Sequence, residues 1–259
     1  MLGFLRNRRR ARLREQPLPD RWWAIIDRRI PLIRGMSAAD RREIGGIINI
    51  LLAEKRFEGC AGVKITDEIR VTIAAQAGVL LLHRDSDYYP TLRTILVYPR
   101  AYIARNVEHN PDGTVTEGPE SRLGESWDLG SVVLSWDDVV RGAADEDDGH
   151  NVVLHEFAHQ LDGESGDMDG APALRGSARY RDWARVLGAE YEDLLADLHD
   201  GHRTLLDPYA ATNPAEFFAV ATELFFERPG AMRRMHPELY EQLSRFYAQD
   251  PAGNPAPDL

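Results

Sequence analysis

The chain has 259 residues and a net charge of −11, from 31 Lys and Arg residues against 42 Asp and Glu residues. This length allows one large domain or two ordinary ones, and the acidic balance argues against a broad electrostatic hold on DNA or RNA. The charge is uneven, because the six arginines of residues 1–14 leave residues 15–259 with a net charge of −17. We therefore expect a basic flexible tail over residues 1–14, with binding of an anionic partner as the alternative.

The cellular compartment of the protein is inferred from features that the sequence does not contain. Its one cysteine, Cys60, cannot form an intramolecular disulfide. Its apolar stretches are much shorter than the roughly 20 residues of a membrane-spanning helix. Glu15, Pro17 and Pro19 stand where a signal peptide would continue with an apolar run. We therefore predict a cytoplasmic protein without a membrane span.

The first quarter of the body is predicted to be helical. Residues 20–33 and 37–57 carry apolar side chains at helical spacing, and Ser37 can cap the second of these helices. A third helix is expected from Thr66, another capping residue, to about His83. We assign residues 15–57 to an N-terminal helical segment packed on the core.

The rest of the chain alternates short strands with longer helices. Strands are predicted over residues 94–98 and 131–136, and the loop over 106–125 is long enough to hold a hairpin or to form a flap over a cleft. Further helices are expected over residues 145–163, 178–198, 213–226 and 237–247. This order predicts an α+β catalytic domain over residues 58–250, followed by a frayed tail over 251–259.

One of these helices carries the clearest chemical motif. His155, Glu156 and His159 form the pattern HExxH. Histidines four positions apart share a helix face and can bind one zinc ion, which would activate a water molecule as the nucleophile. Glu156 lies to one side of that face, where a general base is needed. The alternative is a chance pentapeptide, although the apolar residues around it favour a prepared metal site.

A third protein ligand is expected, because catalytic zinc sites commonly have three. The metzincin extension is excluded, since Asp162 and Ser165 stand where it needs glycine and histidine. Asp162 is either an acceptor that orients a histidine or an ordinary carboxylate at the helix end.

Other candidate carboxylates follow downstream, at Glu190, Glu192, Glu216 and Glu223. Glu216 also fits a capping box, with Asn213 as the cap and a proline at the first helical position. Glu223 lies seven residues later on nearly the same face, as a replacement ligand or as a partner of a ligand. Spacing alone leaves these alternatives open.

The longer motifs resemble the Mlc titration factor A family of zinc-dependent peptidases, whose catalytic core is related to the protease domain of anthrax lethal factor. The resemblance covers about residues 40 to 250. It rests on five segments: HEFAHQLD (155–162), DPYAATNPAEFFAVATELFFE (207–227), ITDEIRVTIAAQAGVLLL (65–82), ILVYPRAYI (95–103) and GSVVLSWDDV (130–139).

The resemblance implies a zincin-like fold with a small mixed sheet, and it implies roles for two further residues. Glu216, 57 positions after His159, would be the third zinc ligand. Tyr209 would stabilise the oxyanion, as a phenol can donate to developing negative charge; the alternative is that it packs under the next helix. His202 is a weaker candidate donor. The strand over 131–136 would be the edge strand that pairs with an extended substrate.

We therefore predict a cytoplasmic zinc metallopeptidase of the gluzincin type that hydrolyses polypeptides, with Glu156 as general base. Aminopeptidase and endopeptidase action are both open. Enterobacterial members of the family also bind the glucose repressor Mlc, which suggests a link to the regulation of sugar uptake. The alternative function is a regulatory protein that sequesters a transcriptional repressor and hydrolyses little. A zinc hydrolase acting on a non-peptide amide is a third possibility.

Overall fold

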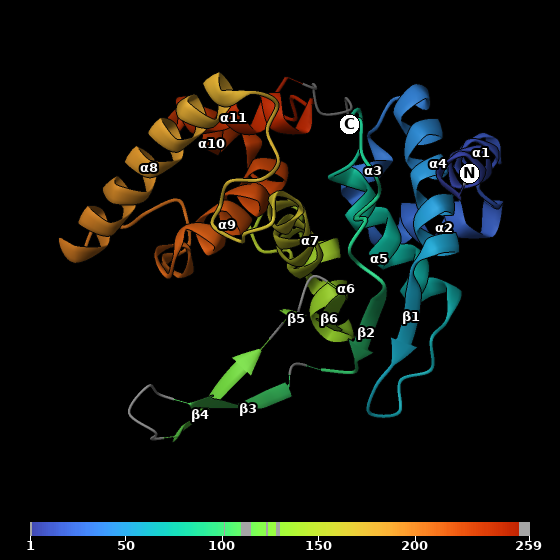
Figure 1. Ribbon diagram of the computed structural model, residues 1–259, viewed down its shortest axis with the longest axis horizontal. Coiled ribbons are helices and arrows are strands. Elements are labelled where there is room, and N and C mark those ends of the chain that lie inside the picture. The colour runs from blue at the N-terminus through green and yellow to red at the C-terminus, as the bar shows by residue number, and fades with distance from the viewer. Residues whose placement is uncertain (1, 101, 110–114, 123, 128–129, 254–259) are drawn as a thin grey trace.

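The computed structural model describes residues 2–100, 102–109, 115–122, 124–127 and 130–253. Figure 1 shows the N-terminal helices gathered at one end of the molecule and the C-terminal helices at the other. Helix α7 and the sheet lie between them. No helix within the described ranges is long and apolar enough to cross a membrane.

The N-terminal end consists of helices. They are α1 (Leu2–Glu15), α2 (Asp20–Arg29), α3 (Pro31–Arg34), α4 (Ala38–Glu54) and α5 (Asp67–Val79). The helix expected over residues 20–33 is divided, because Ile30 leaves the helical conformation and a proline begins α3. Both predicted caps are confirmed: the hydroxyls of Ser37 and Thr66 accept hydrogen bonds from backbone amides of their helices. Helix α5 ends before His83, whose φ of 63° is left-handed.

Residues 2–15 form helix α1, which differs from the flexible tail that composition predicts for residues 1–14. Arg10 of α1 is buried between Glu54 and Asp87, and its guanidinium lies 2.7 Å from the Glu54 carboxylate. We call these three residues the α1 anchor. Gly46 allows the close approach of α1 to α4, because a Cβ there would lie 2.8 Å from the carbonyl oxygen of Arg14.

A four-stranded sheet lies beside α5 and α7. Its strands are β1 (Arg56–Gly59), β2 (Thr94–Tyr98), β6 (Ser131–Ser135) and β5 (Gly124–Trp127), in that order across the sheet. The first three are parallel and β5 is antiparallel to β6. The expectation that residues 131–136 form the edge strand is wrong, because β6 pairs on both sides. Among the described strands β5 lies at that edge.

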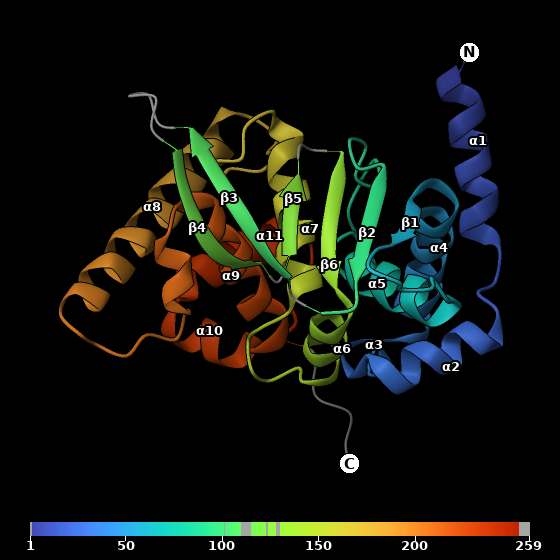
Figure 2. The ribbon, with the colours of Figure 1, turned by 90° about the horizontal axis from the view of Figure 1, so that it is seen from below.

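A separate hairpin occupies most of the segment expected to be a long loop. Strands β3 (Tyr102–His109) and β4 (Val115–Arg122) pair with each other in antiparallel fashion. This confirms the hairpin alternative for residues 106–125. Figure 2 shows the hairpin beside the sheet, at the end nearer the C-terminal helices.

The second half of the chain is helical. Its helices are α6 (Trp136–Ala144), α7 (Val152–Asp162), α8 (Ser177–His199), α9 (Pro214–Glu227), α10 (Pro229–Met235) and α11 (Pro237–Tyr247), with short turns η1 (Gly163–Ser165) and η2 (Pro208–Ala211). Helix α7 begins later than expected, because the acidic run 145–148 lies in the preceding loop. The end of the expected frayed tail, residues 254–259, is outside the described residues.

The core runs through the whole body. Its buried side chains form one cluster from Leu18 to Tyr247. Phe157 of α7 packs edge-on against Tyr89, with ring centroids 4.8 Å apart, and thus holds the middle of α7 against the N-terminal half. The mixture of a small sheet and many helices is α+β, as predicted. The boundary between segments 15–57 and 58–250 stays a prediction.

Candidate metal centre

The apolar residues of helix α7 pack into the core, and this packing determines which side of the helix carries the two histidines. Val153, Leu154 and Phe157 are almost completely buried, so the opposite side of the helix is the one that carries the two histidines. The helix begins at Asn151, whose side-chain oxygen accepts hydrogen bonds from the amides of Val153 and Leu154, both 3.1 Å. The start and the rotation of α7 are therefore fixed by capping and by burial.

Helix α9 brings Glu216 to this face of α7. Asn213 caps α9, and its side-chain oxygen accepts a hydrogen bond of 3.0 Å from the backbone amide of Glu216. The Glu216 side chain does not complete the capping box, because it turns towards α7. The capping role thus belongs to the backbone of Glu216, and its carboxylate is available for another purpose.

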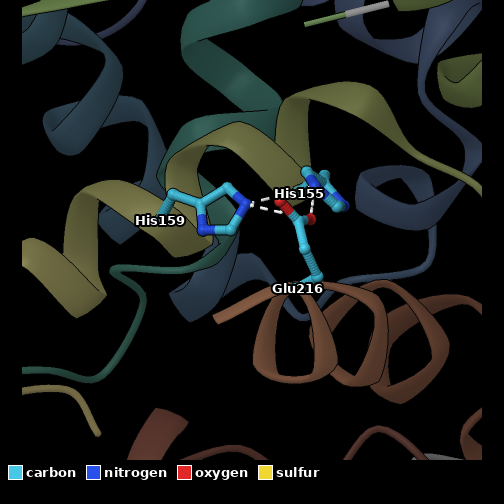
Figure 3. Close-up of side chains that lie close together, drawn as sticks. All are labelled: His155, His159 and Glu216. Carbon is cyan, nitrogen blue, oxygen red and sulfur yellow. Dashed lines mark hydrogen bonds and ion pairs between the residues drawn. The ribbon is translucent and has the colours of Figure 1, made fainter. Parts of the chain in front are cut away.

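Three donor atoms converge between α7 and α9 (Figure 3). Nε2 of His155 and Nε2 of His159 lie 2.9 Å and 3.3 Å from the same oxygen of Glu216, and the two nitrogens lie 3.2 Å apart. Four tetrahedral ligands at zinc bond lengths would lie about 3.3 Å from one another. The spacing of these donors therefore suits one small metal ion. We call His155, His159 and Glu216 the donor cluster.

The side chains of the donor cluster are partly buried and lie close together, and both conditions shift the pKa values of His155 and Glu216. Burial alone would lower the pKa of His155, but hydrogen bonds to Glu216 and Glu223 raise it well above its ordinary value. Burial would raise the pKa of Glu216, but the two imidazoles hold it well below its ordinary value. The imidazoles and the carboxylate thus favour one another's charged forms, and a divalent cation bound there would compete with protons for the same donor atoms.

Glu156 lies beside the donor cluster and is not part of it. Its side chain is only 4% exposed, and Oε2 has no hydrogen-bond partner among the described residues. Burial is the main cause that raises the pKa of Glu156 to about 8. A buried carboxyl group without a partner is costly to a fold. Such a group is suited to exchange a proton near neutral pH.

Glu223 supports His155 from behind. Oε1 of Glu223 lies 2.7 Å from Nδ1 of His155, and its other oxygen accepts a hydrogen bond from the backbone amide of Asn151. Of the two sequence-based alternatives for Glu223, the structure favours the partner of a ligand over a replacement ligand. A carboxylate on Nδ1 fixes the orientation of the ring, whose Nε2 points at Glu216.

Three polar residues behind Glu223 were not singled out from the sequence: Glu227, Gln76 and Asn151. Glu227 is 4% exposed, and burial raises its pKa to about 9 despite nearby donors of Asn151 and His150. Gln76 of α5 accepts a hydrogen bond of 2.9 Å from the side chain of Asn151. The signal for Glu227 was its spacing of four residues from Glu223, and the signal for Asn151 was its position before an apolar helix.

Asp162 holds a loop, and no hydrogen bond links it to either histidine. Its Oδ2 accepts a hydrogen bond of 2.8 Å from the amide of Gly170. Gly170 has a φ of 79° and lies against Pro214, leaving no room for a Cβ. Burial raises the pKa of Asp162 to about 6. Asp162 therefore fastens the loop that packs against the first turn of α9, just before Glu216.

Tyr209 lies near the donor cluster on turn η2. Its ring centroid is 6.1 Å from that of His155, and the side chain is 52% exposed. This exposure argues against the alternative in which Tyr209 only packs under α9. Asp207 fixes the turn, since its side chain accepts a hydrogen bond of 2.8 Å from the Tyr209 amide.

The remaining candidates have other partners or lie at the surface. His202 pairs with Asp197 at the end of α8, where both side chains are largely exposed. Glu190 contacts His236 at 2.7 Å, and Glu192 lies exposed on α8. None of these three belongs to the donor cluster in the described structure.

Comparison with known proteins gives a consistent family. The model of the glucose-regulated metallo-peptidase family M90 matches residues 5–248, which include the whole donor cluster. The chain is 42% identical over 248 residues to an uncharacterized protein of Synechocystis sp., covering 95% of this chain and 90% of the relative. It is also 32% identical to two proteins named Mlc titration factor A. In Serratia proteamaculans the match covers 86% of this chain and 85% of the relative, and in Pectobacterium atrosepticum it covers 90% and 87%.

Proposed function

Because the chain belongs to the glucose-regulated metallo-peptidase family M90, we propose that it is a zinc-dependent peptidase with a zincin-like catalytic domain. The observation that carries this proposal is the convergence of three donor atoms beside a buried glutamate that has no hydrogen-bond partner for one oxygen. Two imidazole nitrogens and one carboxylate oxygen are a donor set typical of catalytic zinc. A structural site would have no use for Glu156.

His155, His159 and Glu216 would hold the ion. When bound there, zinc would polarise the scissile carbonyl and lower the pKa of a water molecule to about 7. Glu223 would keep Nδ1 of His155 occupied and so direct Nε2 to the ion.

Glu156 would act as the general base and then as the general acid. Its carboxylate takes a proton from the attacking water and returns it to the amine of the leaving group. Its buried position, which raises its pKa to about 8, suits a group that must both accept and release a proton near neutral pH. The fixed backbone of α7 places it next to His155.

Tyr209 would donate a hydrogen bond to the oxygen that becomes negatively charged during attack. The short turn η2 carries Tyr209, whose ring centroid lies 6.1 Å from that of His155. A phenol aimed at developing charge stabilises the transition state more than the substrate.

Strand β5 would pair with the backbone of an extended polypeptide substrate. It is the edge strand next to β6, and it lies against α7. Addition of a strand to a sheet edge recognises backbone and leaves side-chain preference to the surrounding pockets. Whether the enzyme acts as an aminopeptidase or inside chains depends on those pockets. We place it in the cytoplasm.

A second candidate function is suggested by the names of two relatives. Mlc titration factor A is the name printed for the Serratia and Pectobacterium proteins. On this ground the chain could bind a transcriptional repressor and thereby regulate sugar uptake. Such a protein needs no general base, so the two functions differ in what Glu156 does.

The test is peptide hydrolysis by the full chain and by Glu156→Gln, against a mixed peptide library, with and without a chelator. We expect the wild type to cleave peptides in a chelator-sensitive way, and Glu156→Gln to lose about 10²–10⁴-fold in kcat/KM while it keeps its zinc. The exposed Glu192→Gln serves as the matched control and should be fully active. Cleavage by Glu156→Gln at the wild-type rate would exclude this mechanism, and an inactive wild type would favour the repressor-binding function.

A further inference from the structure

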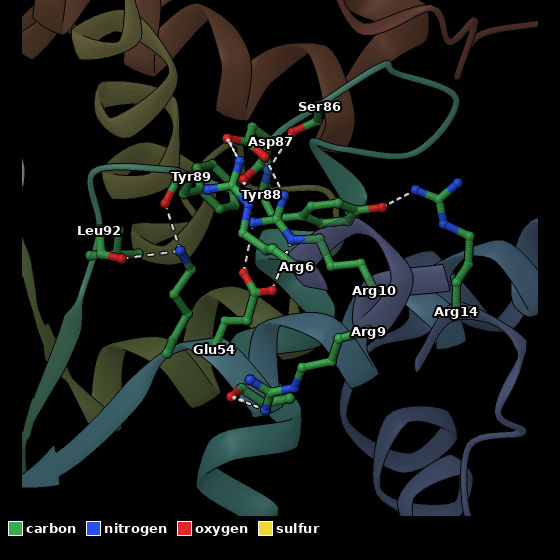
Figure 4. A network of polar contacts seen from close by, with 12 residues as sticks. Arg6, Arg9, Arg10, Arg14, Glu54, Ser86, Asp87, Tyr88, Tyr89 and Leu92 are labelled. Atoms are coloured by element: carbon green, nitrogen blue, oxygen red, sulfur yellow. Dashed lines mark hydrogen bonds and ion pairs between the residues drawn. The ribbon is translucent and has the colours of Figure 1, made fainter. Parts of the chain in front are cut away.

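The six N-terminal arginines have no part in the proposed chemistry, and the structure divides them into two groups. Arg6, Arg10 and Arg14 lie on the side of α1 that faces the body (Figure 4). Arg10 belongs to the α1 anchor, and its guanidinium lies 4.9 Å from the ring centroid of Tyr88. Arg6 pairs with Asp87, and Arg14 donates to the Tyr88 hydroxyl. These three arginines fasten the helix.

The other three arginines are exposed. Within the part of the chain that the structure describes, Arg8 and Arg12 make no hydrogen bond or ion pair, and Arg9 only reaches the carbonyl oxygen of Ala53 at 3.4 Å. Positions 8 and 12 are one helical turn apart and therefore project on the same side of α1. Among the residues that the structure describes, these three positive charges therefore have no negatively charged partner.

Two large apolar side chains accompany these charges. Phe4 is 72% exposed and Leu5 is 56% exposed, in the first turns of α1. Phe4 is four residues before Arg8, so it lies on the same side of the helix. We call Phe4, Leu5, Arg8, Arg9 and Arg12 the outer face of α1.

The outer face is placed where a large surface can reach it. Figure 2 shows α1 at one end of the molecule, with its N-terminus projecting beyond the body. The donor cluster lies on α7 and α9, far along the molecule from α1. A partner on the outer face would therefore leave the donor cluster open.

We propose that the outer face of α1 binds the surface of an anionic lipid bilayer. Exposed apolar side chains can enter the headgroup boundary of a membrane, and arginines beside them can contact anionic headgroups. A nucleic acid backbone would pair with the arginines but would offer nothing to Phe4 and Leu5. The acidic body, with a net charge of −17 over residues 15–259, directs the contact to α1.

Binding to vesicles by the full chain tests this proposal, which does not depend on peptidase activity. Sedimentation with phosphatidylcholine vesicles that contain phosphatidylglycerol should recover the protein, whereas vesicles of phosphatidylcholine alone should not. The combined variant Arg8→Gln, Arg9→Gln, Arg12→Gln should bind the anionic vesicles roughly 100-fold more weakly. The matched control removes the same charge from exposed arginines of the C-terminal half: Arg181→Gln, Arg203→Gln and Arg233→Gln.

A second variant separates a membrane from a nucleic acid. Phe4→Ser with Leu5→Ser keeps every charge, and we expect it to weaken vesicle binding clearly while binding to a DNA duplex stays as it was. Loss of vesicle binding in both the arginine variant and its control, or no binding of the wild type to anionic vesicles, would overturn the proposal. Binding to DNA but not to vesicles, lost only in the arginine variant, would also overturn it and assign the outer face to nucleic acid.

Discussion

The donor cluster and the α1 anchor are both made of ionisable side chains, most of them largely buried, but the two groups are arranged in opposite ways. In the α1 anchor, Arg10 has a carboxylate on either side of its guanidinium. In the donor cluster, two imidazoles approach one carboxylate oxygen, and Glu156 beside them has a buried oxygen without a partner. The difference shows how to tell the two kinds of site apart: paired charges hold helices together, and converging donors leave a place for an ion.

The α1 anchor should give the largest effect on stability. Arg10→Ala leaves the largely buried carboxylate of Glu54 without its partner, and we expect the free energy of unfolding to fall by about 3 kcal/mol. Urea denaturation measures the change, with the exposed Arg8→Ala as control, for which about 0.5 kcal/mol or less is expected. Equal effects of the two substitutions would mean that α1 is not fastened by Arg10.

Tyr209 tests the chemistry proposed for the donor cluster. Tyr209→Phe removes the proposed donor to the oxyanion and should lower kcat by about 100-fold, while the zinc content and the stability stay unchanged. Steady-state kinetics with a cleaved peptide, together with metal analysis, gives both readouts. An unchanged kcat would remove Tyr209 from the mechanism.

Glu223 combines features of the two sites. Its carboxylate is paired, as in the α1 anchor, and it contacts a histidine of the donor cluster. Glu223→Gln weakens the hold on Nδ1 of His155, and we expect zinc affinity to fall by about 10–100-fold. Competition with a chromogenic chelator measures the affinity. If Glu223 has only a structural role, the variant will lose stability but its zinc affinity will match the wild type.

Glu227 should give an effect that is visible only as a dependence of stability on pH. Its pKa is about 9 in the folded protein and near 4.5 in an unfolded chain, so between these values the folded state binds one more proton. The free energy of unfolding therefore falls as pH rises, by about 1.4 kcal/mol per pH unit for this group. Glu227→Gln removes that contribution and should become more stable relative to the wild type with rising pH.

Urea denaturation at several pH values between about 6 and 8 measures this difference, in a window where the unfolded group is ionised and the folded group is protonated. The exposed Glu192→Gln should instead give a curve parallel to the wild type. A parallel curve for Glu227→Gln would show that this carboxyl group is ionised in the folded protein.

Patterns among neighbouring residues of the sequence predicted much of the fold. The caps Ser37 and Thr66 and the strand over 94–98 were predicted correctly, because each depends on neighbouring residues only. The strand order was not, and β6 was wrongly placed at the sheet edge, since nothing in a single strand shows which other strands flank it. Helix α1 was missed for the same reason: Glu54 and Asp87 are 44 and 77 positions away from Arg10.

The candidate site shows the same limit. His155 and His159 could be paired from the sequence because both belong to one helix. Glu216 lies 57 positions after His159, so its role rested on a resemblance to a family, and the structure now places it with the two histidines. Asn151 and Glu227 were not singled out, because their importance depends on the packing of α9 behind α7.

The central claim is that His155, His159 and Glu216 hold one catalytic zinc ion, and the position of that ion tests it most directly. Crystals of the zinc-loaded protein, measured on both sides of the zinc absorption edge, give an anomalous difference map that locates the metal. We predict one peak at about 2.0–2.2 Å from Nε2 of each histidine and from a carboxylate oxygen of Glu216. A peak elsewhere, or one bound without Glu216, would contradict the account.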